Sequence, residues 1–130
     1  HKARKVLPKT MSYADAIHQV SRCAVMTKAL ELGDAHLIHE ACDDRMHEPY
    51  RAKLIPDYAQ AKAISEQSNG TMYISGSGST MMAITPNEKS ADDILKNAKA
   101  AFPDWKIRKM AVDLTGVQSE VIERGKVLHR

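Results

Sequence analysis

The sequence contains few of the residues with which small proteins reinforce a weak hydrophobic core. Its 130 residues include only two cysteines, Cys23 and Cys42, which are too few for a disulfide framework or a cysteine-rich metal site. We expect both to be free thiols that pack as small buried side chains in a reducing compartment. Aromatic residues make up only 5% of the chain, so the core must be built from aliphatic side chains and methionine.

Long apolar runs and a strong charge of one sign are lacking as well. No stretch approaches the roughly 18 apolar residues of a membrane-spanning helix, and there is no signal-peptide pattern, so we expect a cytoplasmic protein with no membrane partner. The net charge of +3 is small, and the dispersed basic residues have no interleaved aromatics, which argues against a nucleic-acid partner. The composition, 43% hydrophobic and 27% charged, is typical of one soluble globular domain over residues 1–130.

Four helices are expected from capping signals and apolar spacing. Ser12 and Asp15 form a capping-box pattern at the start of the first helix, and Gly33 ends it. Asp34 begins the second helix, which Pro49 interrupts. The third helix starts at 56–57 and ends at 69–70, and the fourth runs from Ser90 to the residue before Pro103. The stripe that we expect the first helix to bury consists of Ala16, Ile17, Val20, Ala24, Thr27 and Leu30.

Five segments are strand candidates, at residues 4–7, 71–74, 81–84, 105–114 and 117–123. The alternation of apolar residues slips within 105–114, which suggests a bulge. Helices gathered on one face of a mostly antiparallel sheet would bury the apolar stripes. The expected fold is therefore an α+β, two-layer, ferredoxin-like domain.

A glycine-rich loop joins the two central strands. Ser75, Gly76, Ser77 and Gly78 lie between two short apolar runs, and glycine allows the backbone to approach a ligand closely. Successive N–H groups in such a loop can face an anion, although ordinary hairpin turns use the same residues. Upstream, the guanidinium of Arg51 could hold a carboxylate or a phosphate.

Several segments together resemble the C-terminal half of the homoserine kinase family, within the GHMP kinase superfamily. The similarity covers almost the whole chain, and the stretch from His47 to Pro56 followed by the glycine-rich loop is its most specific part. Two positions depart from the family pattern, because Ser79 replaces the usual proline and Gln19 a frequent asparagine. The segments that carry the resemblance are residues 7–8, 15–17, 20–22, 44–51, 54–56 and 74–80.

The resemblance implies transfer of the γ-phosphate of ATP to the hydroxyl of L-homoserine, with Mg²⁺, on the route to threonine. It implies a two-domain enzyme whose nucleotide loop lies in an N-terminal domain that is missing from this chain, which opens at His1 without a methionine. We therefore expect no catalytic residue and no bound cofactor in the fragment alone, which would be inactive. Arg22 and Arg51 would bind the substrate carboxylate, and Ser75, Gly76, Ser77 and Gly78 would line the cleft.

Other interpretations stay open at this point. The chain could be a stand-alone ferredoxin-like module that binds a small acid or a protein, or half of another small-molecule GHMP kinase. His39 and Asp43 are spaced for metal ligation on a helix, but no third ligand is evident, so we expect no metal site. The oligomeric state is also open, with a homodimer as one option.

Overall fold

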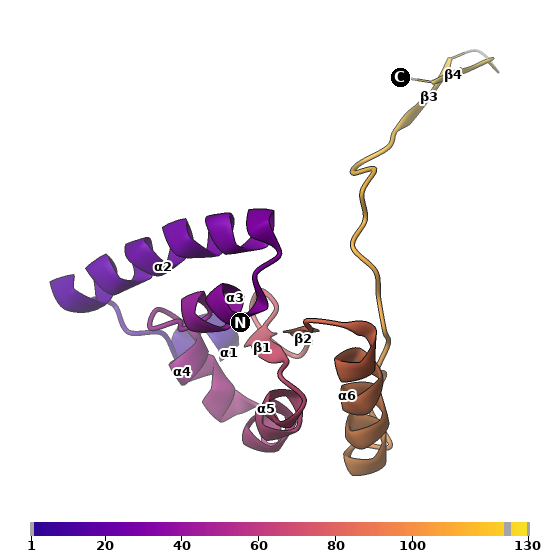
Figure 1. Ribbon diagram of the computed structural model, residues 1–130. Coiled ribbons are helices and arrows are strands. Elements are labelled where there is room, and N and C mark those ends of the chain that lie inside the picture. The colour runs from indigo at the N-terminus through magenta and orange to yellow at the C-terminus, as the bar shows by residue number, and fades with distance from the viewer. Residues whose placement is uncertain (1, 124–125, 130) are drawn as a thin grey trace.

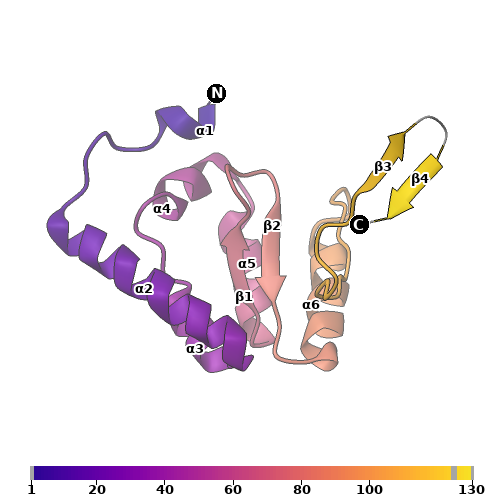
Figure 2. The ribbon, with the colours of Figure 1, turned by 90° about the horizontal axis from the view of Figure 1, so that it is seen from above.

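The computed structural model describes residues 2–123 and 126–129, and it confirms the α+β class. In Figure 2, a long helix and a shorter one lie on one side of a central hairpin, one helix lies behind the hairpin, and another lies on the opposite side. The elements in chain order are α1 Lys2–Lys5, α2 Tyr13–Leu32, α3 Ala35–Ala41, α4 Glu48–Arg51, the 3₁₀ turn η1 Ala52–Leu54, α5 Tyr58–Gln67, β1 Thr71–Ile74, β2 Met81–Ile84, α6 Glu88–Ala101, β3 Glu120–Glu123 and β4 Lys126–His129.

The central hairpin forms as predicted. Strands β1 and β2 pair antiparallel, with Thr71 opposite Ile84 and Ile74 opposite Met81, so the glycine-rich segment is the hairpin loop. Helix α5 packs against β1 and α6. The core lies between these elements, where Ala61, Met72 and Phe102 are buried and Trp105 stacks on Phe102 at 4.1 Å between ring centroids.

The sheet differs from the single layer that the sequence suggested. The described strands form two separate two-stranded sheets, and β3 pairs with β4, a strand that the sequence did not indicate. The predicted strand at 105–114 is wrong, because this segment leaves α6 as extended chain without a strand partner (Figure 1). Met110, Val112 and Leu114 are 76%, 84% and 91% exposed. Alternation of apolar residues makes a strand only where a neighbouring strand supplies the ladder hydrogen bonds.

Two predictions near the N-terminus are also wrong. Residues 2–5 form the short helix α1, where the sequence suggested a strand over residues 4–7. The predicted apolar stripe of α2 faces outward, since Ile17 is 67% exposed and Val20 72% exposed. The opposite face of α2 packs on α3 and on the segment that follows it.

The local helix signals mostly hold. Ser12 accepts a hydrogen bond from the Asp15 backbone N–H, and Gly33 ends α2 with φ of 64°. Asp34 caps α3 by accepting from the Leu37 N–H. Helix α3 ends at Ala41, before Pro49, and residues 48–51 form the separate turn α4. Helix α6 begins at Glu88 with Asn87 as its cap, two residues before the predicted start at Ser90.

The cysteines agree in part with expectation. Both are free, but Cys23 is exposed and Cys42 is only half-buried, so neither packs as a core residue.

Within the described residues, none of the helices has both the length and the apolar character needed to cross a membrane.

Candidate active-site surface

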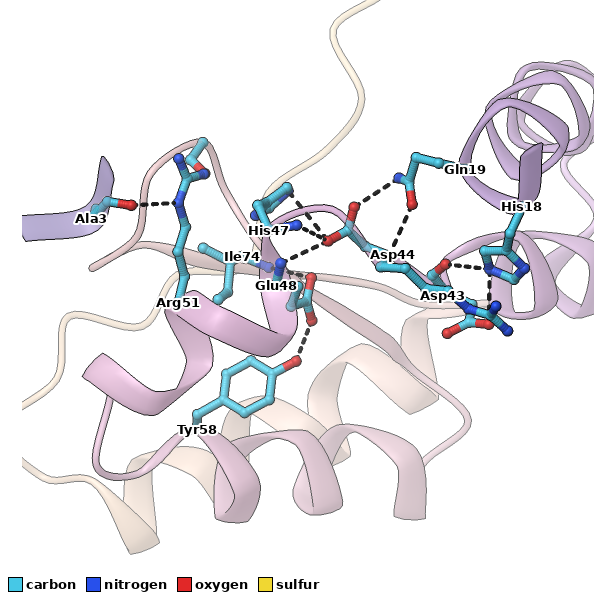
Figure 3. Close-up of polar contacts among 12 residues, drawn as sticks. Ala3, His18, Gln19, Asp43, Asp44, His47, Glu48, Arg51, Tyr58 and Ile74 are labelled. Carbon is cyan, nitrogen blue, oxygen red and sulfur yellow. Dashed lines mark hydrogen bonds and ion pairs between the residues drawn. The ribbon is translucent and has the colours of Figure 1, made fainter. Parts of the chain in front are cut away.

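Arg51 and the glycine-rich loop, which the sequence analysis singled out separately, are in direct contact. Arg51 ends α4, and its Nη1 donates a hydrogen bond to the Gly76 carbonyl at 2.7 Å. Its Nε donates to the Ala3 carbonyl of α1 at 3.2 Å. Figure 3 shows the guanidinium between these two segments. Its Nη2 has no hydrogen-bond partner among the described residues, so the outer edge of the guanidinium can take a carboxylate.

The loop itself has a defined backbone. The Ser75 N–H donates to the Thr80 carbonyl at 2.9 Å, which closes the hairpin. Gly76 and Gly78 have φ of 61° and 111°, values that favour glycine. Ser79 has φ of 63°, which proline cannot adopt because its ring fixes φ near −65°. The departure at Ser79 therefore permits a backbone conformation that proline would exclude.

Glu48 connects α4 to the strand that enters this loop. Its side chain is buried, its Oε2 accepts a hydrogen bond from the Ile74 backbone N–H at 3.3 Å, and its Oε1 accepts a hydrogen bond from the Tyr58 hydroxyl. Burial raises the pKa of Tyr58, and the hydrogen bond to Glu48 and its negative charge raise the pKa further. The sequence analysis gave Glu48 no role, because nothing in the chain order indicates that it meets Ile74.

Asp44 connects α4 to α2. Its Oδ2 accepts from the N–H groups of His47 at 2.7 Å and Glu48 at 2.6 Å, and its Oδ1 accepts from Gln19 Nε2 at 2.7 Å. Burial acts to raise the pKa of Asp44, but the hydrogen bonds from the two N–H groups outweigh it and hold the pKa below its usual value. Asp44 lies three residues before His47, the N-cap residue of α4, so the helix-capping rule gives no signal for it.

Arg22 lies on the inward face of α2, half-buried. No hydrogen bond or ion pair joins Arg22 to Arg51 or to the loop within the described residues. Its Nε is buried and has no hydrogen-bond partner there. Its neighbours on the same helix face, His18 and Gln19, bond to Asp43 and Asp44. The structure thus places Arg51 in contact with the loop, whereas the Arg22 Nε has no hydrogen-bond partner among the described residues.

The other candidate groups have structural partners. His39 Nδ1 lies 3.2 Å from the Thr71 hydroxyl, and Asp43 pairs with His18 at 3.1 Å. Among the described residues, no cluster of three or more His, Cys, Asp or Glu side chains is placed to hold a metal ion. An apolar groove of about 540 Å³ between the hairpin and α6 reaches the far end of the loop at Ser79 and Thr80.

Comparison with known proteins assigns the family. The family described as "GHMP kinases C terminal" matches residues 26–104, which is more than half of the chain. The chain belongs to this family. It is 40% identical over 120 residues to a homoserine kinase from Clostridium botulinum, covering 88% of this chain and 40% of that protein. It is 44% identical over 119 residues to a homoserine kinase from Crocosphaera subtropica, covering 88% of this chain and 38% of that protein.

A solved structure agrees with the sequence relatives. A crystal structure of homoserine kinase from Cytophaga hutchinsonii superposes with a TM-score of 0.73 and 28% identity, over 78% of this chain and 33% of that one. The resemblance to the homoserine kinase family is thereby confirmed. The chain spans about two fifths of the length of these two sequence relatives.

Proposed function

We propose that this chain is the C-terminal, substrate-side domain of a homoserine kinase that transfers the γ-phosphate of ATP to the hydroxyl of L-homoserine, a step toward threonine. The observation that carries the proposal is the contact of Arg51 with the glycine-rich loop, since it places a cation beside a loop of close backbone approach. The named relatives support this reaction over a stand-alone binding module.

In this proposal Arg51 holds the substrate carboxylate through the outer edge of its guanidinium. The edge that carries Nε is already engaged by the Ala3 carbonyl, so the carboxylate approaches Nη1 and Nη2. Arg22, with its unpartnered Nε, is the second candidate for the same carboxylate. Ser75, Gly76, Ser77 and Gly78 form the wall beside the substrate. Holding the substrate in one orientation is itself catalytic, because phosphoryl transfer depends on alignment and charge stabilisation.

The remaining parts of the reaction belong to the rest of the enzyme. ATP and Mg²⁺ would be bound chiefly by an N-terminal domain, and the domain described here would then be inactive alone. Mg²⁺, when bound, would neutralise charge on the phosphates. We place the enzyme in the cytoplasm, and a homodimer is one assembly compatible with this proposal.

The test is the substitution Arg51→Lys in the complete protein, assayed for phosphorylation of homoserine. Lysine keeps the charge but loses the two-pronged contact, which costs roughly 1.5–3 kcal/mol, or about ten- to a hundredfold in kcat/KM for homoserine. The KM for ATP should change much less. The melting temperature should also fall modestly, because lysine cannot reach both Gly76 and Ala3.

Arg45→Lys is the matched control, since Arg45 is an exposed arginine whose side chain pairs only with Asp15 in the described part of the chain. It should leave the kinetics within about twofold, as expected for a surface ion pair. Unchanged homoserine kinetics in Arg51→Lys, together with a lower melting temperature, would show that Arg51 is structural and that the site assignment is wrong.

A further inference from the structure

One turn of helix, α4, contacts both the last residue of β1 and the glycine-rich loop that follows it. Glu48 begins α4 and Arg51 ends it, and the two side chains lie on neighbouring positions of the same helix face. Glu48 accepts from the N–H of Ile74, the last residue of β1, and Arg51 donates to the carbonyl of Gly76 in the loop. Residues 74 and 76 are two positions apart in the chain, so two side chains that lie on one face of a helical turn can reach both.

The carboxylate of Glu48 is itself held on both sides. The Tyr58 hydroxyl of α5 donates to Oε1, and the Ile74 backbone N–H of β1 donates to Oε2. Glu48 is only 9% exposed. A buried carboxylate is tolerated only where hydrogen bonds replace its water, and here two different elements, α5 and β1, provide them (Figure 3). Since the other edge of β1 pairs with β2, Glu48 caps the free edge of β1 at the point where the loop begins.

We propose that Glu48 is a positioning residue that fixes the distance between the guanidinium of Arg51 and the glycine-rich loop. It acts through Ile74 and α4 and does not touch the substrate. This inference rests on the proposed function, because it gives Glu48 a part in orienting the carboxylate of homoserine. The property that matters is the reach of the side chain to both Ile74 and Tyr58, and its charge is secondary.

Two substitutions in the complete protein separate reach from charge. Glu48→Asp keeps the charge but is one methylene shorter, so it cannot reach both partners. Glu48→Gln keeps the length, and its amide can accept from Ile74 and donate to the Tyr58 oxygen. We expect Glu48→Asp to raise the KM for homoserine about tenfold with little change in the KM for ATP, and Glu48→Gln to stay within about threefold of wild type. Glu31→Asp and Glu31→Gln, on an exposed part of α2, are matched controls that should change neither constant.

Hydrogen exchange gives a second measurement that does not depend on activity. The amides of residues 74–78 should exchange faster in Glu48→Asp than in Glu48→Gln or wild type. Tyr58→Phe keeps the contact between Glu48 and Ile74, so its amides 74–78 should show a smaller increase in exchange rate. This variant provides the test if the Glu48 variants fail to fold. The reverse ranking of Glu48→Asp and Glu48→Gln, or a lower melting temperature with unchanged KM and unchanged exchange, would overturn the inference. If the wild-type protein does not phosphorylate homoserine, the proposed function fails, while the exchange ranking still decides whether Glu48 fixes the loop.

Discussion

Replacing Asp44 with asparagine should destabilise the domain far more than its small change in shape suggests. The carboxylate accepts hydrogen bonds from the N–H groups of His47 and Glu48 and from the Gln19 amide. Asparagine retains one acceptor oxygen. If that oxygen still accepts from the N–H groups of His47 and Glu48, the new amide nitrogen faces the side-chain nitrogen of Gln19. Both nitrogens are then donors, and they cannot bond to each other. Gln19 cannot turn its amide without cost, because its oxygen accepts from the Arg45 N–H at 2.9 Å.

One buried donor is therefore left without an acceptor in either orientation. An unsatisfied donor costs about 1–3 kcal/mol, and the remaining hydrogen bonds lose their ionic strengthening. We expect Asp44→Asn to lower the free energy of unfolding by about 2–3 kcal/mol, which corresponds to roughly 8–12 °C in melting temperature for a domain of this size. Thermal and urea unfolding followed by circular dichroism measure both quantities.

The difference in the free energy of unfolding between wild type and Asp44→Asn should become smaller at low pH. The pKa of Asp44 is lowered in the folded state, since the N–H groups of Glu48 and His47 outweigh the effect of burial, whereas the unfolded value is near 3.9. The stabilisation from the ionised carboxylate is thus complete above the unfolded pKa and is lost as the pH falls through the folded pKa. The gap between wild type and Asp44→Asn should be constant from about pH 7 to 5 and should narrow below about pH 4.

The neighbouring residue provides the control. Asp43 has a side chain 58% exposed, and its partner His18 also contacts the Asp43 backbone carbonyl at 3.0 Å, which the substitution leaves in place. Asp43→Asn should therefore cost less than about 1 kcal/mol. Equal stability of the two variants at pH 7 would refute the reasoning. So would a gap for Asp44→Asn that stays the same down to pH 3.

Two further predictions concern packing and thiol reactivity. Gly70→Ala would place a Cβ 2.5 Å from the Ser65 Oγ and 2.6 Å from the Ile94 Cδ1. Unfolding experiments should therefore show that the free energy of unfolding falls by about 1–3 kcal/mol. A decrease of less than about 0.5 kcal/mol would mean that the α5–α6 contact is loose. With a thiol reagent at neutral pH, the exposed Cys23 should react quickly and Cys42 slowly, because burial, and then the charge of Glu48, raises the pKa of Cys42. Both thiols should react at once in denaturant, and equal rates in the native protein would contradict the structure.

The sequence predicted the parts of the fold that depend on local signals. The hairpin was placed to the residue, since two apolar runs flank a loop rich in glycine and serine. The caps at Ser12, Gly33 and Asp34 were also correct, because each involves residues within one turn of helix. The meeting of Arg51 with the loop region was indicated by the resemblance, and the direct contact with Gly76 was found in the structure.

The errors concern which partner each surface meets. Periodicity identified the apolar side of α2 correctly, but it could not tell that this side faces away from the described domain. The inward side uses polar contacts, in which His18 and Gln19 bond to Asp43 and Asp44. The segment 105–114 has the alternation of a strand and no neighbouring strand in the described structure. Glu48 was missed for the same reason, because its role depends on residues 10 and 26 positions away in the chain.

The unusual residue at the end of the loop indicates how the loop keeps its shape. Ser79 has a left-handed backbone with φ of 63°, which costs a non-glycine residue about 1–2 kcal/mol. The resemblance to the family leads one to expect proline at this position, whose ring would have restricted the backbone without any external contact. With serine, the restriction must come from contacts, since an unfavourable conformation persists only where the surroundings enforce it. The hydrogen bond from the Ser75 N–H to the Thr80 carbonyl supplies part of it from within the loop. The contacts that enter the loop from α4, through Ile74 and Gly76, are suited to this task. In this chain, the loop therefore relies on its contacts with Glu48 and Arg51, and at Ser79 it adopts a backbone conformation that proline would exclude.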